Sequence, residues 1–158
     1  MSKHLSISDI NKWHSKEFGD KKIVELKNGS YCEVYTKFKP TSIQQLIIDY
    51  QEILEQLQKK TDNKEVAKDV TFVFYMLLLK HFSSLGNKIP MDVEKIIVLC
   101  EKLIDLGILE ELLNAFPQEE LGKINEMMYK VSMNTRMIGD QIGELFLQTE
   151  LAKDESDA

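Results

Sequence analysis

Histidine and cysteine side chains are the first to test for chemistry, because imidazoles and thiolates bind metals and act as bases or nucleophiles. The chain has three histidines, His4, His14 and His81, and two cysteines, Cys32 and Cys100. None of these residues has a second ligand at the short spacing of a zinc motif. We therefore expect no metal and no cofactor. His81 is expected to be a core or rim histidine bonded to a backbone carbonyl, and Cys100 to be a packing residue.

Acidic side chains recur at helical spacing, as Glu52 with Glu55 and Glu101 with Asp105. A pair of carboxylates performs acid–base catalysis only within a shared cleft that separates the two pKa values. Lysines stand close to both pairs, which is typical of a solvated helix face with ion pairs. No glycine-rich phosphate loop is present. The sequence therefore predicts no catalytic residue and no small-molecule substrate.

The overall composition is that of a globular protein with an acidic surface. Of 158 residues, 43% are hydrophobic and 29% charged, and the formal net charge is −6. A net negative charge repels a phosphate backbone unless basic residues gather on one face, and no such cluster stands out. The longest apolar run, Phe72 to Leu79, falls short of the roughly 18 to 20 residues that span a bilayer. We expect a cytoplasmic protein, in a host cell if phage-encoded, that binds neither nucleic acid nor membrane.

Apolar residues at three- and four-residue spacing predict a mainly α-helical fold. We expect a bundle of about five to six helices with an N-terminal β-hairpin, the helix that contains Val70 being central. Residues 1–151 are expected to form one domain, with the first helix and the hairpin in 1–39, the bundle in 40–151, and a disordered acidic tail in 152–158. The helices are expected to begin at or near Ser8, Thr41, Val66, Pro90, Leu109 and Gln118.

A β-hairpin is the clearest local feature. Asn28 and Gly29 separate two segments rich in β-formers, so that Lys22–Lys27 and Ser30–Lys37 are predicted to pair through a two-residue type I′ turn. Two strands alone are marginally stable in water. The hairpin must therefore contact a helix, add strands, or pair with another chain.

The last predicted helix is expected to have two apolar faces. A rotation of about 100° per residue separates one stripe from a second that contains methionines. One face can contact the domain's own core, and the other needs an intramolecular neighbour or a partner. Flexible methionine side chains suit a surface that adapts to a bound helix. The candidate partner-binding residues are Tyr129, Met133, Met137, Leu147 and Leu151.

The order of these features resembles a known family. An N-terminal helix, the hairpin segment Ile23–Gly29, and Phe38–Thr41 at the start of a helical domain are similar to the tail assembly chaperones of phages and prophages of Gram-positive bacteria, of the Listeria and Bacillus siphophage type. The resemblance implies a non-enzymatic protein that binds the long helical tape measure protein during tail assembly. It also implies self-association and, in many members, a longer form made by frameshifting.

Two other classes stay open on the sequence alone. A small helical regulator that binds another protein or DNA would fit the size and the helical content. DNA binding would require a salt-dependent basic surface, against which the net charge argues. An enzyme would require a site assembled from distant residues such as Tyr75, His81 and Glu101.

Overall fold

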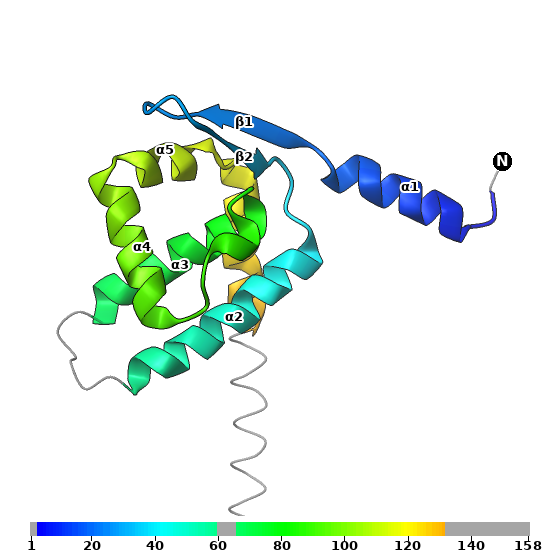
Figure 1. Cartoon of the computed structure of the whole chain (residues 1–158). Coiled ribbons are helices and arrows are strands. Elements are labelled where there is room, and N and C mark those ends of the chain that lie inside the picture. The colour runs from blue at the N-terminus through cyan, green and yellow to red at the C-terminus, as the bar shows by residue number, and fades with distance from the viewer. Residues whose placement is uncertain (1–2, 60–65, 132–158) are drawn as a thin grey trace, which may run out of the picture. The chain divides into compact units, whose positions relative to one another are not determined.

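The structure, a computed structural model, describes residues 3–59 and 66–131. Within these residues the fold is mainly α-helical with one two-stranded antiparallel sheet, as the sequence predicts (Figure 1). Residues 1–121 and 122–158 form two compact units. The elements are α1 (Ile7–Phe18), β1 (Lys21–Glu25), β2 (Tyr31–Tyr35), α2 (Pro40–Gln58), α3 (Val66–Phe82), the 3-10 turn η2 (Gly86–Lys88), α4 (Val93–Asp105), α5 (Ile108–Ala115) and a last helical segment at 118–131.

The hairpin is present, but its turn differs from the predicted type I′. The Gly29 amide donates to the Leu26 carbonyl, and the Leu26 amide donates to the Ser30 carbonyl, at 3.0 and 2.9 Å. Gly29 has a φ of 87°, and no described non-glycine residue has a positive φ. A type I′ turn needs two residues with positive φ, so Asn28 rules it out here. The connection is a three-residue loop with a glycine bulge, and it shortens both strands.

Two helices begin at other residues than predicted, because their N-cap residues differ from the predicted ones. The α1 helix begins at Ile7, because the Asp9 amide donates to the Ser6 hydroxyl at 3.1 Å; Ser8 is not its cap. The α4 helix begins at Val93, where the Asp92 carboxylate accepts from the third residue of the helix, and not at Pro90. In both cases a nearby side-chain oxygen satisfies a free amide of the first turn.

The α2 helix starts without a side-chain cap. Its N-cap is Lys39 and Pro40 is its first residue, so the capping box predicted for Thr41 does not form. Proline suits this position because its φ is preset and it has no amide to satisfy. The α3 helix stops at Phe82, before the predicted stop at Gly86, and the chain then enters η2.

The centre of the 1–121 unit is α3, which packs against α2, α4 and β2. Its side chains are buried around most of its circumference, which confirms the prediction of a central helix. Three phenylalanines hold the surrounding elements together. The Phe38 ring stacks on Phe82 with centroids 3.8 Å apart and meets the edge of Phe116 at 5.6 Å. Aromatic pairs of this kind add about 0.5–1.5 kcal/mol beyond the burial of their area.

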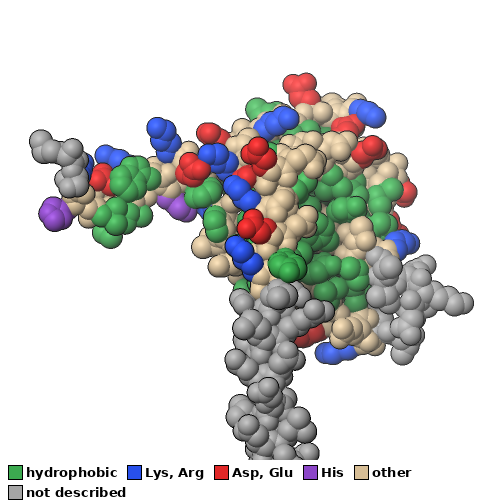
Figure 2. All heavy atoms as spheres, turned by 180° about the vertical axis from the view of Figure 1, so that it is seen from behind, with side chains coloured by type: hydrophobic (Ala, Val, Ile, Leu, Met, Phe, Trp, Pro, Cys, Tyr) green, Lys and Arg blue, Asp and Glu red, His purple; other side chains and the backbone are tan. Residues whose placement is uncertain are grey.

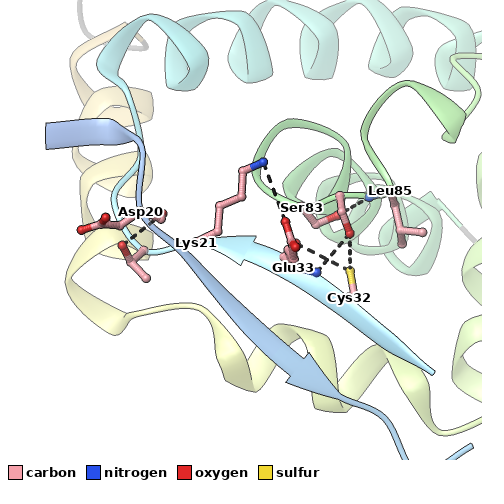
Figure 3. A network of polar contacts seen from close by, with 8 residues as sticks. Asp20, Lys21, Cys32, Glu33, Ser83 and Leu85 are labelled. Atoms are coloured by element: carbon pink, nitrogen blue, oxygen red, sulfur yellow. Dashed lines mark hydrogen bonds and ion pairs between the residues drawn. The ribbon is translucent and has the colours of Figure 1, made fainter. Parts of the chain in front are cut away.

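The end of α3 covers one edge of the hairpin. The Ser84 amide donates to the Glu33 carbonyl at 2.8 Å, and the Glu33 amide donates to the Ser84 hydroxyl at 3.0 Å. Val34 also forms a bridge with Ser83. Figure 3 shows Cys32 and Glu33 facing this end of the helix. The requirement that the hairpin contact a helix is therefore met through β2.

Candidate functional site

The predicted partner surface on the last helix lies mostly outside the described residues. Tyr129 is described and is 67% exposed. Met133, Met137, Leu147 and Leu151 lie outside the described residues, as does the acidic segment 152–158. The surface proposed from sequence therefore stays a prediction, with its first residue available to a partner.

The α1 helix presents a second, better defined apolar surface. None of its residues is buried. Ile7, Ile10 and Trp13 are 74%, 39% and 58% exposed. At about 100° per residue these three side chains fall on one side of the helix, which also carries Glu17, while Lys12 and the serines occupy the other. We call Ile7, Ile10 and Trp13 the α1 apolar face. Phe18 does not belong to it, because it is half-buried and lines a cavity with His81 and Phe82. Figure 2 shows hydrophobic side chains exposed on this helix.

The α1 helix has little tertiary support within the described residues. A helix of 12 residues is marginally stable in water without tertiary packing. Here the Ser6 cap, Asp9 in the first turn and Lys16 in the last turn support the helix locally. The apolar face contributes nothing to the core, so its side chains are available for binding.

The exposed side of the hairpin extends this apolar character. Ile23 and Tyr31 are 61% and 67% exposed. They line a shallow groove of about 540 Å³ with Glu25 and Glu33. Six of the eleven large apolar side chains that are exposed in the described residues lie before residue 32, namely Leu5, Ile7, Ile10, Trp13, Ile23 and Tyr31. The N-terminal helix and hairpin therefore form the main candidate binding region.

His81 is bonded to a carboxylate and not to the predicted backbone carbonyl. Its Nε2 lies 2.7 Å from Asp49 Oδ2, and Gln45 Nε2 donates to Asp49 Oδ1 at 3.0 Å. The two side chains of the pair are 14% and 10% exposed. Asp49 is thus the described residue that sequence reasoning missed. A helical spacing of Gln45 and Asp49 was visible in the sequence, but nothing in it linked Asp49 to a residue on another helix.

The His81 member of this pair borders a small cavity. The cavity has a volume of about 70 Å³ and is lined also by Lys37, Lys39 and Ser42. An imidazole oriented by a carboxylate is one component of a general base, but catalysis also needs a positioned nucleophile or substrate. Lys37 Nζ pairs with Glu17 at 2.8 Å, and this pair raises the pKa of Lys37. The His81–Asp49 bond joins α3 to α2, and the Lys37–Glu17 pair joins the segment before α2 to α1. These contacts connect elements of the fold, which favours a structural role for them.

The remaining groups considered for chemistry sit apart from this cluster. Cys100 is fully buried, and burial together with the neighbouring Glu101 raises its pKa to about 11. Its thiol is therefore protonated at neutral pH and unsuited to nucleophilic attack. Glu52 and Glu55 are exposed on α2, and Glu101 pairs with Lys68 at 3.9 Å. Among the described side chains no three His, Cys, Asp or Glu residues are grouped as metal ligands.

The part of the chain that matches a known family contains both α1 and the hairpin, the candidate binding region. A family model described as YomO matches residues 7–156. The SPbeta prophage-derived uncharacterized protein YomO of Bacillus subtilis (strain 168) is 26% identical over 129 residues, which cover 79% of this chain and 73% of that protein. No solved structure matches the chain. In the described part of the chain, no helix has both the length and the apolar character needed to cross a membrane.

Proposed function

The chain belongs to the YomO family, and on this premise we propose that it is a phage or prophage protein that acts by binding another protein, without a catalytic site. The phage origin is supported by the relative from the SPbeta prophage. The site of action is then the cytoplasm of the host cell. The observation that carries the proposal is the α1 apolar face, an amphipathic helix none of whose residues is buried.

The chemistry of this face indicates the kind of partner. Ile7, Ile10 and Trp13 offer aliphatic and aromatic surface along about two turns of helix. This is the pattern by which an amphipathic helix binds an apolar groove or a second helix. Tryptophan is among the residues that contribute most to binding energy at interfaces. A partner that itself exposes an apolar helical stripe fits this surface.

A more specific form of the proposal names the client. The order of helix, hairpin and helical domain resembles that of tail assembly chaperones, and a long helical tape measure protein exposes apolar stripes that need cover during assembly. We propose the tape measure protein of the same phage genome as the client. Self-association is part of the same proposal.

The test is co-expression with that tape measure protein, followed by pulldown and a titration with a purified helical fragment. The variant Ile10→Gln with Trp13→Gln removes the centre of the α1 apolar face. We expect a loss of affinity of at least about 30-fold, since interface tryptophans commonly contribute 2 kcal/mol or more. The matched control, Lys12→Gln with Ser15→Gln, changes the opposite side of the same helix and should retain the client.

Two outcomes would contradict the proposal. If neither the full chain nor its variants retain the tape measure protein at low and moderate salt, the client is wrong. If the client binds but the two double variants bind equally well, the α1 apolar face is not the docking surface. Circular dichroism and thermal unfolding should be unchanged in both variants, because no residue of α1 is buried.

A further inference from the structure

The outer edge of β1 has free backbone groups. The hydrogen bonds of Leu26 with Ser30 and of Thr36 with Asp20 show which residue pairs bond to each other across the two strands. In an antiparallel ladder the bonded and non-bonded pairs alternate. Ile23 is opposite Glu33, whose amide and carbonyl point away from β1 and bond Ser84. The amides and carbonyls of Lys21, Ile23 and Glu25 must therefore point outward from the opposite edge.

Within the described residues α5 contacts β1, but no strand pairs with its outer edge. Figure 1 shows β1 as the outer strand of the sheet, with α3 and β2 on its other side. Among the described residues, the outward amides of Lys21, Ile23 and Glu25 donate no hydrogen bond. An uncovered edge strand is a template for pairing with another chain.

The edge is complementary to itself. When β1 is placed antiparallel to a second β1 with Ile23 opposite Ile23, Lys21 falls opposite Glu25 and Glu25 opposite Lys21. The outward backbone groups of all three residues then meet in this register and make about six hydrogen bonds. Opposite charges directly across a strand pair are favourable, and like charges are not. A parallel arrangement would instead bring lysine toward lysine and glutamate toward glutamate.

We propose that two copies of this chain pair along β1, antiparallel and centred on Ile23, to form a four-stranded sheet with two-fold symmetry. The arrangement is isologous, so the same surface patch serves both copies. It brings two Ile23 side chains, each 61% exposed in the single chain, next to each other on the open face of the sheet. The inference specifies the self-association proposed above and rests on that part of the proposed function. It uses the hairpin alone, so it can stand or fail independently of the client that binds α1.

The dimer is expected to be weak. Five residues per strand bury less than the roughly 1,200 Å² of a standard interface, so dimerisation should occur in the micromolar range or above. Sedimentation of the full chain over a wide concentration series measures this equilibrium. A chain that is monomeric up to about 1 mM overturns the proposal.

A charge exchange tests the register. Lys21→Glu and Glu25→Lys each place two like-charge pairs in the dimer, and each should weaken dimerisation by roughly tenfold. The combination of both substitutions restores opposite charges and should restore dimerisation. Lys21 also pairs with Glu33 in the same chain at 3.8 Å, a contact that the combined variant leaves broken, so rescue reports the contact between copies. The control Lys22→Glu, whose opposite residue is Val24, should leave dimerisation unchanged.

A cysteine pair gives a second readout that does not depend on charge. Ile23→Cys places two thiols opposite each other at about 5.5 Å between Cα atoms, a distance that a disulfide spans. The native Cys32 and Cys100 are buried. Mild oxidation should give a covalent dimer for Ile23→Cys and not for the control Tyr31→Cys, which lies one strand further from the axis. Equal crosslinking of both variants, or a dimer unaffected by the charge exchange, overturns this pairing.

Discussion

Substitutions at the Asp49–His81 pair distinguish a structural role of this contact from a chemical one. Both side chains are nearly buried, and their atoms lie 2.7 Å apart. Removing one member leaves the other buried without its partner, which costs about 2–4 kcal/mol. We therefore expect Asp49→Ala and His81→Ala each to lower the melting temperature by roughly 5–15 °C for a domain of this size.

Chemical denaturation of the single and double variants measures the coupling between the two residues. The pair is in direct contact, so the double variant should lose about 1–3 kcal/mol less than the sum of the single losses. Asp49→Asn keeps an oxygen acceptor and should cost less than Asp49→Ala. Glu52→Ala removes an exposed carboxylate from the same helix and should change stability by less than about 0.5 kcal/mol.

A stability change within 0.5 kcal/mol for both Asp49→Ala and His81→Ala would refute this reasoning. The pair would then hold no part of the fold, and its burial beside a cavity lined by Ser42 and two lysines would have to be explained by binding or catalysis. A search for an activity lost in His81→Ala would become the next experiment.

Three further predictions concern the core and the turns. Phe38→Ala should cost about 3–5 kcal/mol in denaturant unfolding, because the ring contacts two other buried phenylalanines, and Phe38→Leu should cost clearly less. Folding raises the pKa of the Cys100 thiol from 9.0 to about 11. The stability that the protonated thiol contributes is therefore fully present below pH 9 and is lost as the pH rises toward 11. The thiol should resist labelling in the folded protein at pH 8. Gly107→Ala should destabilise the protein by about 1 kcal/mol, because φ is +72° at this position even though a methyl group would meet no neighbour. The control Gly122→Ala lies in a helix without a positive φ and should not destabilise the protein.

The elements were predictable because their signals are local. Periodicity identified the helices and placed α3 at the centre, and the Asn28–Gly29 dipeptide identified the hairpin. The wrong predictions concern which of several neighbouring residues caps a helix or forms a turn. Ser6 and Ser8 are both good caps, and only the structure shows whose oxygen reaches an amide. Asn28 tolerates a positive φ but does not adopt one, so the turn gains a residue.

The candidate site was less predictable because it depends on contacts distant in sequence. The partner of His81 is 32 residues away on another helix, and a sequence gives no sign of that pairing. The α1 helix shows the opposite difficulty. Its amphipathic pattern would be the same if it packed on the core, so the sequence could indicate an apolar face but not that the face is exposed.

The two candidate surfaces of the N-terminal region are suited to different partners. The α1 apolar face has a single side-chain donor, the Trp13 indole N–H, and otherwise selects by shape and apolar area, which suits a varied helical client. The β1 edge offers directional backbone groups and one complementary charge register, which selects for a single strand sequence, that of β1 itself. Only Gly19 and Asp20 separate the two elements, so pairing along β1 would bring two α1 helices into one assembly. A client that contacts both helices would then bind more tightly than one α1 allows, through the effective concentration of the second site.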